Sequence, residues 1–318
     1  MSFDLKEEIK KKAEELHIDL IGFAEAQNAE DFWPFYEKRI QKDYFADVGG
    51  VGEVARRLRV FDVMAKAKTV IAVALCYNHP IALLDPGHPS RSGIISAHVF
   101  RQDYHQVMQQ KMKALIAHMS ELTDERFVFQ SYCDTGVLDD RIWAWRAGLG
   151  FFGKNNFIIH PSLGSYLFLG HIVTDLPIMR YDRPMNNLCG SCRACIDKCE
   201  SGALCDAYEL NAKRCISNLT QKKNLREEEE ALLGRHVYGC DVCQQVCPFN
   251  ARAKTSVHAC FKPKADDVYV SCDEIIAMDE TSFREKYENT ALYWRGYTII
   301  KRNAKIVKHN IYSEEERQ

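Results

Sequence analysis

Residues 189–199 read Cys189-Gly190-Ser191-Cys192-Arg193-Ala194-Cys195-Ile196-Asp197-Lys198-Cys199, with cysteines separated by two, two and three residues. A second group follows, in which Cys215 stands alone and Cys240, Cys243 and Cys247 precede Pro248. The first run has the spacing of bacterial ferredoxins, except that Glu200 stands where proline is usual. In that spacing, two-residue loops wrap thiolates around one iron–sulfur cube, and the three-residue step sends the next cysteine to the other cube.

This spacing predicts two 4Fe–4S clusters with no ligand left over. The predicted ligands are Cys189, Cys192, Cys195 and Cys247 for one cluster, and Cys199, Cys215, Cys240 and Cys243 for the other. Zinc is the alternative metal because it also favours paired Cys-x2-Cys motifs, but zinc sites seldom use a run of this form. The remaining cysteines of this region, Cys205, Cys260 and Cys272, fit neither group and are expected to be ordinary thiols.

Composition bounds the class of protein. At roughly 150 residues per domain, 318 residues predict two domains, and 46% hydrophobic with 27% charged residues is ordinary for a folded chain. Lys plus Arg is 42 and Asp plus Glu is 44, which argues against a globally basic nucleic-acid binder but not against a local basic patch. We find no signal peptide and no apolar run near the roughly 20 residues of a membrane helix. A cytoplasmic location is expected, where cysteines favour metal sites over disulfides.

The cysteines also mark a domain boundary. Residues 1–188 contain only Cys76 and Cys133, whereas residues 189–272 contain the other eleven. The N-terminal region mixes both kinds of pattern: helices are expected over residues 4–16 and 101–121 and around Leu138, Ile142 and Trp145, and strands over 69–75, 157–159 and 166–169. The predicted class is α+β or α/β: a layered domain over residues 1–180, an iron–sulfur domain over 181–262 and a short helical segment over 263–318.

The segment from Cys133 to Asn155 has two interpretations. From the residues alone, Asp134 is favoured as a helix N-cap, a role that contributes about 1 kcal/mol, and a functional carboxyl is the alternative. Asp139 and Asp140 suit the first turn of the same helix. Gly148, Gly150 and Gly153 have the spacing of nucleotide-binding loops but follow a helix instead of a strand, so they are expected to end that helix and to permit close backbone approach.

Together these motifs resemble the epoxyqueuosine reductase (QueG) family, and the resemblance runs to about residue 310. The residues that carry it are Lys66-Ala67-Lys68, Asp103-Tyr104-His105, Asp134-Thr135-Gly136, Arg146-Ala147-Gly148, Lys154-Asn155, Gly164-Ser165-Tyr166, Arg214-Cys215-Ile216-Ser217 and Tyr238-Gly239-Cys240-Asp241. The resemblance implies a cobalamin-binding domain followed by a ferredoxin-like domain. The implied reaction removes the epoxide oxygen of epoxyqueuosine in tRNA and yields queuosine.

The family also implies roles for individual residues. Asp134 becomes the proton donor beside the corrin, and a carboxyl kept protonated by desolvation would suit that task. Cobalamin contacts carried over by similarity are Arg57, Ile158, Leu169, Ser217, Asp241 and Val242. Two alternatives remain open: Arg57 belongs to a basic run that could be a solvated face, and Ile158 and Leu169 could be core residues.

The C-terminal region departs from the family. Family members continue into HEAT-like helical repeats that hold tRNA, and this chain is expected to lack most of them. Residues 295–308 are basic and follow Trp294, which suits either RNA binding or a solvated helix face. Lys222 and Lys223 lie in a segment that faces tRNA in the family.

The expected partners are tRNA carrying epoxyqueuosine and an external low-potential electron donor, with no membrane and a monomeric state. Two other functions remain in competition: a related cobalamin and iron–sulfur reductase acting on a smaller molecule, and a non-enzymatic electron-transfer or corrinoid-handling protein.

Overall fold

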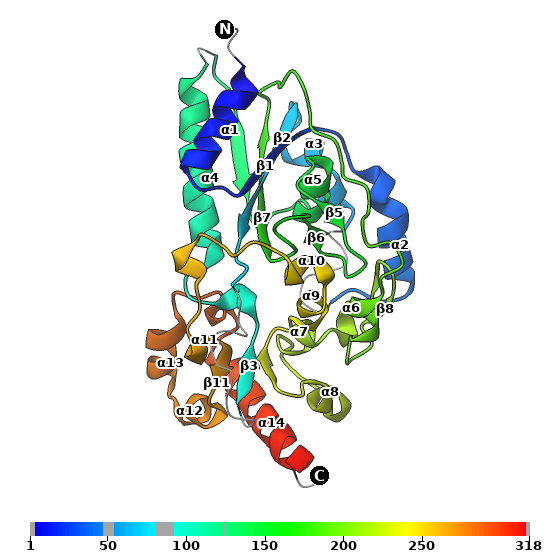
Figure 1. Cartoon of the computed structure of the whole chain (residues 1–318), viewed down its shortest axis with the longest axis vertical. Helices are drawn as coiled ribbons and strands as arrows, with labels where there is room; N and C mark the ends of the chain where they lie inside the picture. The colour runs from blue at the N-terminus through cyan, green and yellow to red at the C-terminus, as the bar shows by residue number, and fades with distance from the viewer. Residues whose placement is uncertain (1–3, 47–53, 80–91, 124, 316–318) are drawn as a thin grey trace.

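The computed structural model describes residues 4–46, 54–79, 92–123 and 125–315. Figure 1 shows a long molecule with α1 (Leu5–Glu15) at one end and α14 (Tyr297–Glu315) at the other. The end that contains α1 is built around a sheet, and the α14 end is mostly helical. Within the described residues, every helix is too short or too polar to cross a bilayer.

The main sheet is antiparallel throughout. Its strand order is β1-β2-β7-β4, with β1 at Leu20–Glu25, β2 at Thr69–Cys76, β7 at Leu167–Thr174 and β4 at Phe129–Tyr132. The prediction of a central buried strand over 69–75 is confirmed, since every residue of β2 is buried between two neighbouring strands. The pairing makes this region an α+β layered fold, because a parallel α/β sheet would need crossover connections.

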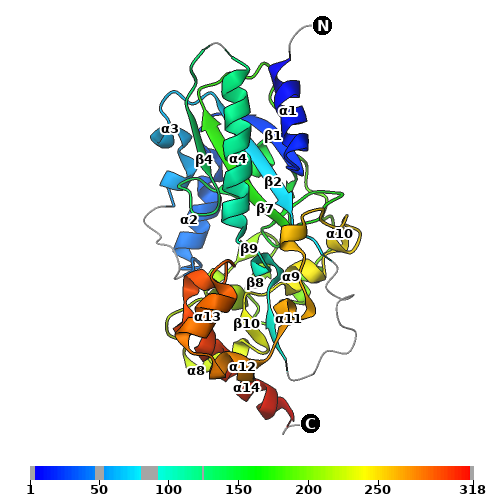
Figure 2. The same ribbon diagram turned by 90° about the vertical axis from the view of Figure 1, so that its left-hand side faces the viewer.

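Two helical layers explain why β2 is apolar on both faces. Ile71, Val73 and Leu75 point into a core shared with α1 and α4 (Tyr104–Glu121), while Val70 and Ala72 point into a second core with α5 (Asp140–Arg146). Figure 2 shows α1 and α4 lying across the front of the sheet. The predicted helices over 4–16 and 101–121 are therefore confirmed as α1 and α4, with slightly narrower bounds.

The remaining predictions for the N-terminal region are partly confirmed. Strands were expected over 157–159 and 166–169, and the structure has β6 at Ile158–Ile159 and the longer β7. Ile142 and Trp145 lie on α5 as expected, but Leu138 precedes the helix. As predicted, the helix ends just before Gly148, which has a φ of 74°.

A second sheet contains one strand from each of the three regions predicted from the sequence, 1–180, 181–262 and 263–318. Its order is β10-β3-β11, with β10 at His236–Tyr238, β3 at Gly93–Ile95 and β11 at Tyr269–Val270. The C-terminal segment is thus not purely helical. Its strand β11 has only two residues, which is too short to show the alternating hydrophobic pattern of a strand in the sequence. Helix α14 packs against β10 and α12 (Cys272–Ala277), and buried Asn303 donates to the carbonyls of Thr220 and Val237.

The cysteine region consists of short helices and hairpins. These are α6 (Ala194–Asp197), β8 (Leu204–Asp206), β9 (Glu209–Leu210), α7 (Ile216–Leu219), α8 (Glu227–Leu232), α9 (Val242–Gln245) and α10 (Pro248–Ala251). The other elements are α2 (Trp33–Gln41), α3 (Val60–Val63), β5 (Phe151–Phe152), α11 (Ala265–Val268), α13 (Glu280–Tyr287) and the 3-10 helices η1 (Glu30–Phe32), η3 (Arg56–Leu58), η5 (Ala97–Val99), η6 (Ala212–Arg214), η7 (Ala259–Phe261) and η8 (Tyr293–Arg295).

Candidate active site

The structure gathers the eight predicted cysteine ligands into two sets, as the spacing predicts. The outer set lines a cavity of about 210 Å³, here called the outer cavity, and consists of Cys189, Cys192, Cys195 and Cys247. The inner set lines a cavity of about 310 Å³, here called the middle cavity, and consists of Cys199, Cys215, Cys240 and Cys243. Cys205, Cys260 and Cys272 line neither cavity.

Each set of four thiols surrounds a space, which suits a cube with a thiolate at each iron corner. Across the described residues, no three His, Cys, Asp or Glu side chains converge closely enough for a single metal ion. Burial raises the pKa of the Cys240 thiol to about 12, so the charge of bound iron would be needed to hold it as a thiolate. The cysteines therefore fit two clusters, and their ligation remains a prediction.

A third cavity contains Asp134. It has a volume of about 310 Å³ and shares Tyr77, His98 and Phe157 with the middle cavity. The middle cavity in turn shares Asn155 with the outer cavity. The three cavities thus form a continuous row from the outer cysteines, past the inner cysteines, to Asp134.

The residues carried over as cobalamin contacts fall mostly on this row. Arg57 and Leu169 line the Asp134 cavity, and Ser217, Asp241 and Val242 line the middle cavity. Arg57 is the half-buried member of its basic run, whereas its neighbours are exposed. Ile158 lines neither cavity and is buried in the core beneath α5, which is the packing role that was its alternative. Contact with a corrin stays a prediction for all of them.

Asp134 is not a helix cap. Its backbone is left-handed, with a φ of 58°, and its N–H donates to Asp140 Oδ2 at 2.8 Å. The N-cap of α5 is Asp139, whose carboxylate accepts the N–H of Arg141. The N-cap interpretation is therefore wrong, because the helix begins six residues later than Asp134. The Asp134 side chain is 65% exposed and lines the cavity.

A histidine decides the charge of Asp134. His105 Nε2 lies 3.5 Å from Asp134 Oδ2, and its Nδ1 lies 2.7 Å from Asp103 Oδ1. The His105 imidazole and the Tyr104 hydroxyl hold the pKa of Asp134 below its usual range. Burial opposes a charge on His105, yet the two carboxylates raise its pKa to about 9. In this state the proton lies on His105, and Asp134 is ionised instead of being a protonated acid.

Two buried carboxylates hold the Asp134 loop in place. Asp139 forms an ion pair with Arg141 at 2.7 Å and accepts the Tyr36 hydroxyl at 2.5 Å. Burial alone would raise its pKa, but the Arg141 guanidinium holds that pKa well below the ordinary value. Asp140 hydrogen bonds with buried His171 at 2.5 Å while accepting the N–H of Asp134. Burial raises the pKa of Asp140, and His171 opposes that rise.

Sequence patterns missed the residues at the junction of the cavities. His98 lies on η5, and Ser96 and Ala97 beside it donate to the carboxylate of Asp241 at 2.6 and 2.7 Å. Both carboxylate oxygens of Asp241 thus hold the loop that contains His98 in place. Burial lowers the pKa of His98, so its imidazole favours the neutral form. A single histidine outside a long helix or strand belongs to no periodic pattern, so the sequence does not single out His98. Gly239 is the nearest sequence signal, because a Cβ at that position would meet Ser96 at 2.4 Å.

The cations of the basic C-terminal segment divide into two groups: Lys305 is exposed and Lys308 pairs with Asp273 at the surface, whereas the other three bind internal carbonyls. Arg302 donates to the carbonyls of Lys222 and Lys223, Arg295 donates to that of Gln221, and Lys301 donates to that of Met278. Burial lowers the pKa of Arg302. These three cations cap backbone carbonyls of the neighbouring region, so they serve the packing of α14 more than a solvated face or an RNA phosphate.

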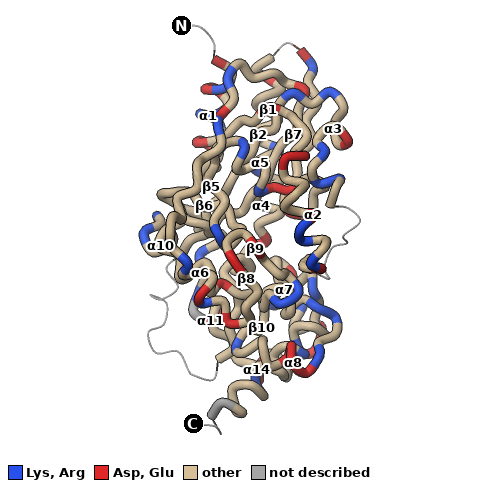
Figure 3. Tube along the Cα trace, turned by 90° about the vertical axis from the view of Figure 1, so that its right-hand side faces the viewer, with Lys and Arg blue, Asp and Glu red and all other residues tan. Residues whose placement is uncertain are grey.

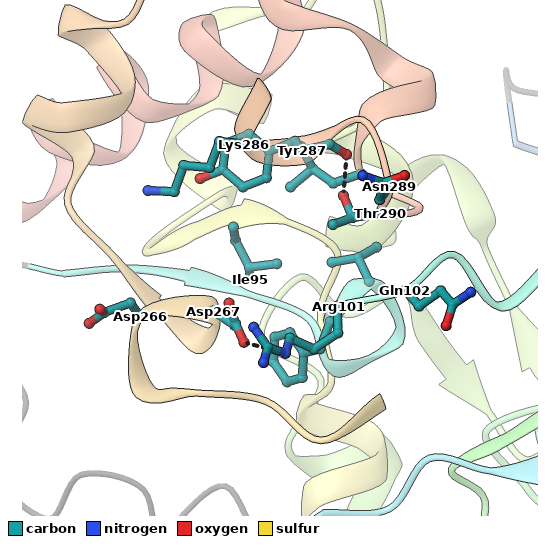
Figure 4. Close-up of a pocket in the computed structure, with 12 residues that line it drawn as sticks. Ile95, Arg101, Gln102, Asp266, Asp267, Lys286, Tyr287, Asn289 and Thr290 are labelled. Carbon is teal, nitrogen blue, oxygen red and sulfur yellow. Dashed lines mark hydrogen bonds and ion pairs between the residues drawn. The ribbon is translucent and has the colours of Figure 1, made fainter. Parts of the chain in front are cut away.

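A separate cavity of about 340 Å³ lies between η5 and α13 and contains none of the predicted site residues. Figure 4 shows Arg101 and Asp267 on one side of it and Lys286 and Tyr287 on the other. Its wall adjoins the site at Val99, which follows His98 on η5, and at Asn289, whose carbonyl accepts the N–H of Asp103 at 2.7 Å. The cavity row, and not this space, combines the cysteines with Asp134.

Comparisons with known proteins support this arrangement. The family model described as "Epoxyqueuosine reductase QueG" matches residues 57–135, and the model described as "4Fe-4S double cluster binding domain" matches residues 188–250. The epoxyqueuosine reductase of Bacillus subtilis is 34% identical over 308 residues, which cover 95% of this chain and 78% of the relative. The epoxyqueuosine reductase of Leadbetterella byssophila is 31% identical, and the match covers 96% of this chain and 99% of the relative.

A solved structure gives the same answer for the fold. The crystal structure of an epoxyqueuosine reductase with an epoxyqueuosine-modified tRNA-Tyr stem loop superposes with a TM-score of 0.89 at 32% identity, covering 96% of this chain and 81% of that one. The Bacillus relative is longer than the matched region, whereas the Leadbetterella relative is matched over nearly its whole length. The chain belongs to the epoxyqueuosine reductase (QueG) family.

Proposed function

We propose that this protein reduces the epoxide of epoxyqueuosine in tRNA to the alkene of queuosine, using two 4Fe–4S clusters and cobalamin. The observation that carries the proposal is the row of cavities, in which the cavity of the inner cysteines shares a wall of Tyr77, His98 and Phe157 with the cavity of Asp134. Family membership and the match to the double-cluster domain support the same reaction.

Reduction of an epoxide to an alkene consumes two electrons and two protons and releases water. The two C–O bonds break, and the oxygen needs protons to leave. Bound cobalamin would supply a strongly reducing cobalt centre for the C–O cleavage. The residues that would hold it lie on either side of the wall that the two cavities share: Arg57 and Leu169 line the Asp134 cavity, and Ser217 and Val242 line the middle cavity.

The chain itself manages the proton. His105 stores it while the Asp134 carboxylate faces water. Filling of the cavity would remove Asp134 from water, and desolvation favours the neutral carboxyl. The first proton then moves from His105 Nε2 to Asp134 Oδ2, across 3.5 Å, and from there to the departing epoxide oxygen, and the second proton comes from solvent.

An exposed aromatic near the cavities suits an RNA substrate. The Trp294 side chain is 57% exposed, its Nε1 donates to the Tyr238 hydroxyl at 2.7 Å, and the Arg295 guanidinium lies 4.7 Å from its ring centre. Tyr238 packs against His98 at the junction of the cavities. An aromatic ring beside an arginine can stack an unpaired base, which is how proteins commonly hold single-stranded RNA.

The finer organisation is part of the same proposal. It comprises a cobalamin-binding region over residues 1–180, a ferredoxin-like region over 181–262 and a C-terminal region over 263–318. The protein acts as a monomer in the cytoplasm and receives electrons from an external donor.

The direct test is mass spectrometry of nucleosides from epoxyqueuosine-containing tRNA after anaerobic incubation with reconstituted protein, cobalamin and a low-potential reductant. Queuosine is expected to form at the expense of epoxyqueuosine. If no queuosine forms although the clusters and cobalt are spectroscopically reduced, the proposal fails for this substrate.

One observation favours a smaller substrate as the second candidate. Three C-terminal cations that could bind phosphates, Arg295, Lys301 and Arg302, are held by internal carbonyls. Undetectable binding of the modified tRNA at low salt, together with reduction of the free epoxyqueuosine nucleoside, would favour this candidate.

A further inference from the structure

The outer cysteine set lies at the surface. Cys192 is exposed and Cys189 is partly exposed, whereas the inner set lies between the outer cavity and the cavity of Asp134. Electrons that arrive from outside therefore have their shortest entry at the outer set. This position makes the surface around Cys189 and Cys192 a place where an electron carrier can approach a cluster closely.

The surface around the outer set combines an apolar residue with unpaired cations. Leu188 lines the outer cavity and is 52% exposed. Arg252 lies on the wall of the cavity, exposed Lys254 follows it by two residues, and exposed Lys198 directly follows α6. None of these three cations forms an ion pair with a described residue. Figure 3 shows blue segments next to α6 and α10, the helices that flank the outer set, and red segments next to α6 as well.

The nearby acids cancel only part of this charge. Asp197 and Asp206 share Arg193, at 3.6 and 3.2 Å, which leaves one negative charge in excess, and exposed Glu200 adds another. The charge of these acids together with Lys154, Arg193, Lys198, Arg252 and Lys254 is still positive. Lys154 also lines the cavity, but its ammonium group donates to the carbonyls of Gly190 and Cys192 at 2.7 and 2.8 Å and is fixed there. An exposed apolar residue surrounded by free cations favours a protein partner with an acidic surface, because complementary charge speeds the encounter.

We propose that Leu188, Lys198, Arg252 and Lys254 form a docking surface for an acidic one-electron carrier protein that reduces the outer cluster. The proposal rests on the function above, since the reaction needs electrons from outside. Each encounter oxidises the carrier by one electron and reduces the outer cluster by one, and two encounters supply the two electrons of one epoxide reduction. The carrier is not consumed and transfers no atom or proton.

The alternative role of these cations is to offset the negative charge of the cluster itself. That role would change the reduction potential of the cluster and its reactivity with every reductant. A docking role would change only the rate with a protein donor and would depend strongly on ionic strength. The two roles can therefore be separated by using one protein donor and one small donor.

The test uses the reconstituted holoprotein and stopped-flow bleaching of the visible absorbance of the clusters, with fully reduced flavodoxin, an acidic carrier, as the probe. Dithionite serves as the small reductant. The variant Lys198→Glu/Lys254→Glu reverses two charges of the proposed surface. The matched control Lys66→Glu/Lys113→Glu reverses two exposed lysines on the α3–β2 turn and α4, away from the outer cysteine set.

The second-order rate constant with flavodoxin should fall about tenfold or more in the Lys198/Lys254 variant at low salt, and its dependence on ionic strength should weaken. The rate with dithionite, the cluster potentials and all the values of the control variant should match the unmodified protein. An unchanged flavodoxin rate would overturn the proposal, and so would an equal loss with dithionite. Because cluster bleaching is measured without tRNA, these outcomes are independent of whether the epoxide is reduced.

Discussion

Asp134 and Asp139 lie five positions apart, yet the fold treats them in opposite ways. The Asp134 side chain is 65% exposed to the cavity and has only a 3.5 Å contact with His105. The Asp139 side chain is 5% exposed and is held by both Arg141 and Tyr36. A carboxyl that exchanges a proton must reach solvent or substrate and must be weakly tied, whereas a carboxyl that fixes a loop must be buried and paired. The difference lies in the environment and not in the residue type.

The largest expected effect is on catalysis at Asp134. Asp134→Asn keeps the size of the side chain and removes the transferable proton, so kcat should fall by roughly 10²–10⁴. Cluster reduction by dithionite and the thermal midpoint should not change, because Asp134 is exposed and supports no helix. Asp266→Asn, at an exposed aspartate in the separate cavity, is the control. Full activity of Asp134→Asn would show that this carboxyl is not the acid, and an electron-carrier function would then gain support.

The next effect is on stability at Asp139. Asp139→Ala removes the partner of both Arg141, whose side chain is 35% exposed, and the buried Tyr36 hydroxyl, and the loss of such partners costs about 1–3 kcal/mol. A shift of the thermal midpoint under anaerobic conditions measures the loss. The matched control is Asp31→Ala, which removes the partner of Arg146 from a surface pair whose Asp31 side chain is 57% exposed, and it should cost no more than about 1 kcal/mol. Equal shifts for the two variants would refute the contrast between locked and free carboxylates.

A smaller effect is expected at Asp140, which is largely buried and paired like Asp139 but lies in direct contact with Asp134. Its carboxylate accepts the N–H of Asp134 and so holds the left-handed turn from a buried position. Asp140→Ala should lower kcat about tenfold through misplacement of Asp134, equivalent to about 1.4 kcal/mol, while KM changes little. Asp140→Asn retains an acceptor oxygen and should restore most of the activity. An equal loss in both variants would mean that the charge and not the acceptor matters.

The smallest effect concerns pH. In the folded protein the Asp103 and Asp134 carboxylates raise the pKa of His105 from the ordinary 6.5 to about 9, and the protonated form supplies the proton. Activity should therefore fall as pH rises through about 9. The contribution of His105 to stability is fully present below pH 6.5 and is lost over the same rise. His105→Gln should lower kcat at neutral pH and remove this limb from the profile. A limb at the same pH in His105→Gln would assign it to another group.

Sequence patterns predicted the elements better than their pairing. The cysteine spacing predicted both sets of four, because ligand spacing is local and strict. Hydrophobic periodicity predicted β2, α1 and α4, because long apolar patterns reflect burial directly. The strand order of the main sheet and the two-residue β11 depend on contacts between distant segments, and no local pattern encodes those.

The site shows the same division. The family resemblance identified Asp134, and five of the six carried-over contacts line the cavity row. The protonation of the site was not predictable, because it depends on His105 approaching Asp134 from another element at 3.5 Å. The N-cap interpretation of Asp134 failed for a related reason. Asp134, Asp139 and Asp140 all lie near the start of α5, and the sequence does not show which of them is the N-cap. In the structure it is Asp139.

The three-stranded sheet β10-β3-β11 has a consequence for biosynthesis. Its middle strand comes from residues 93–95, and its outer strands come from residues 236–238 and 269–270. The carbonyls of Thr220 and Val237 also accept hydrogen bonds from Asn303 of α14, which is synthesised later. The region that carries the inner cysteines therefore completes its packing only after nearly the whole chain has left the ribosome. Iron–sulfur assembly on the inner set is thus expected to be a late, post-translational event, and fragments that end before α14 should load this cluster poorly.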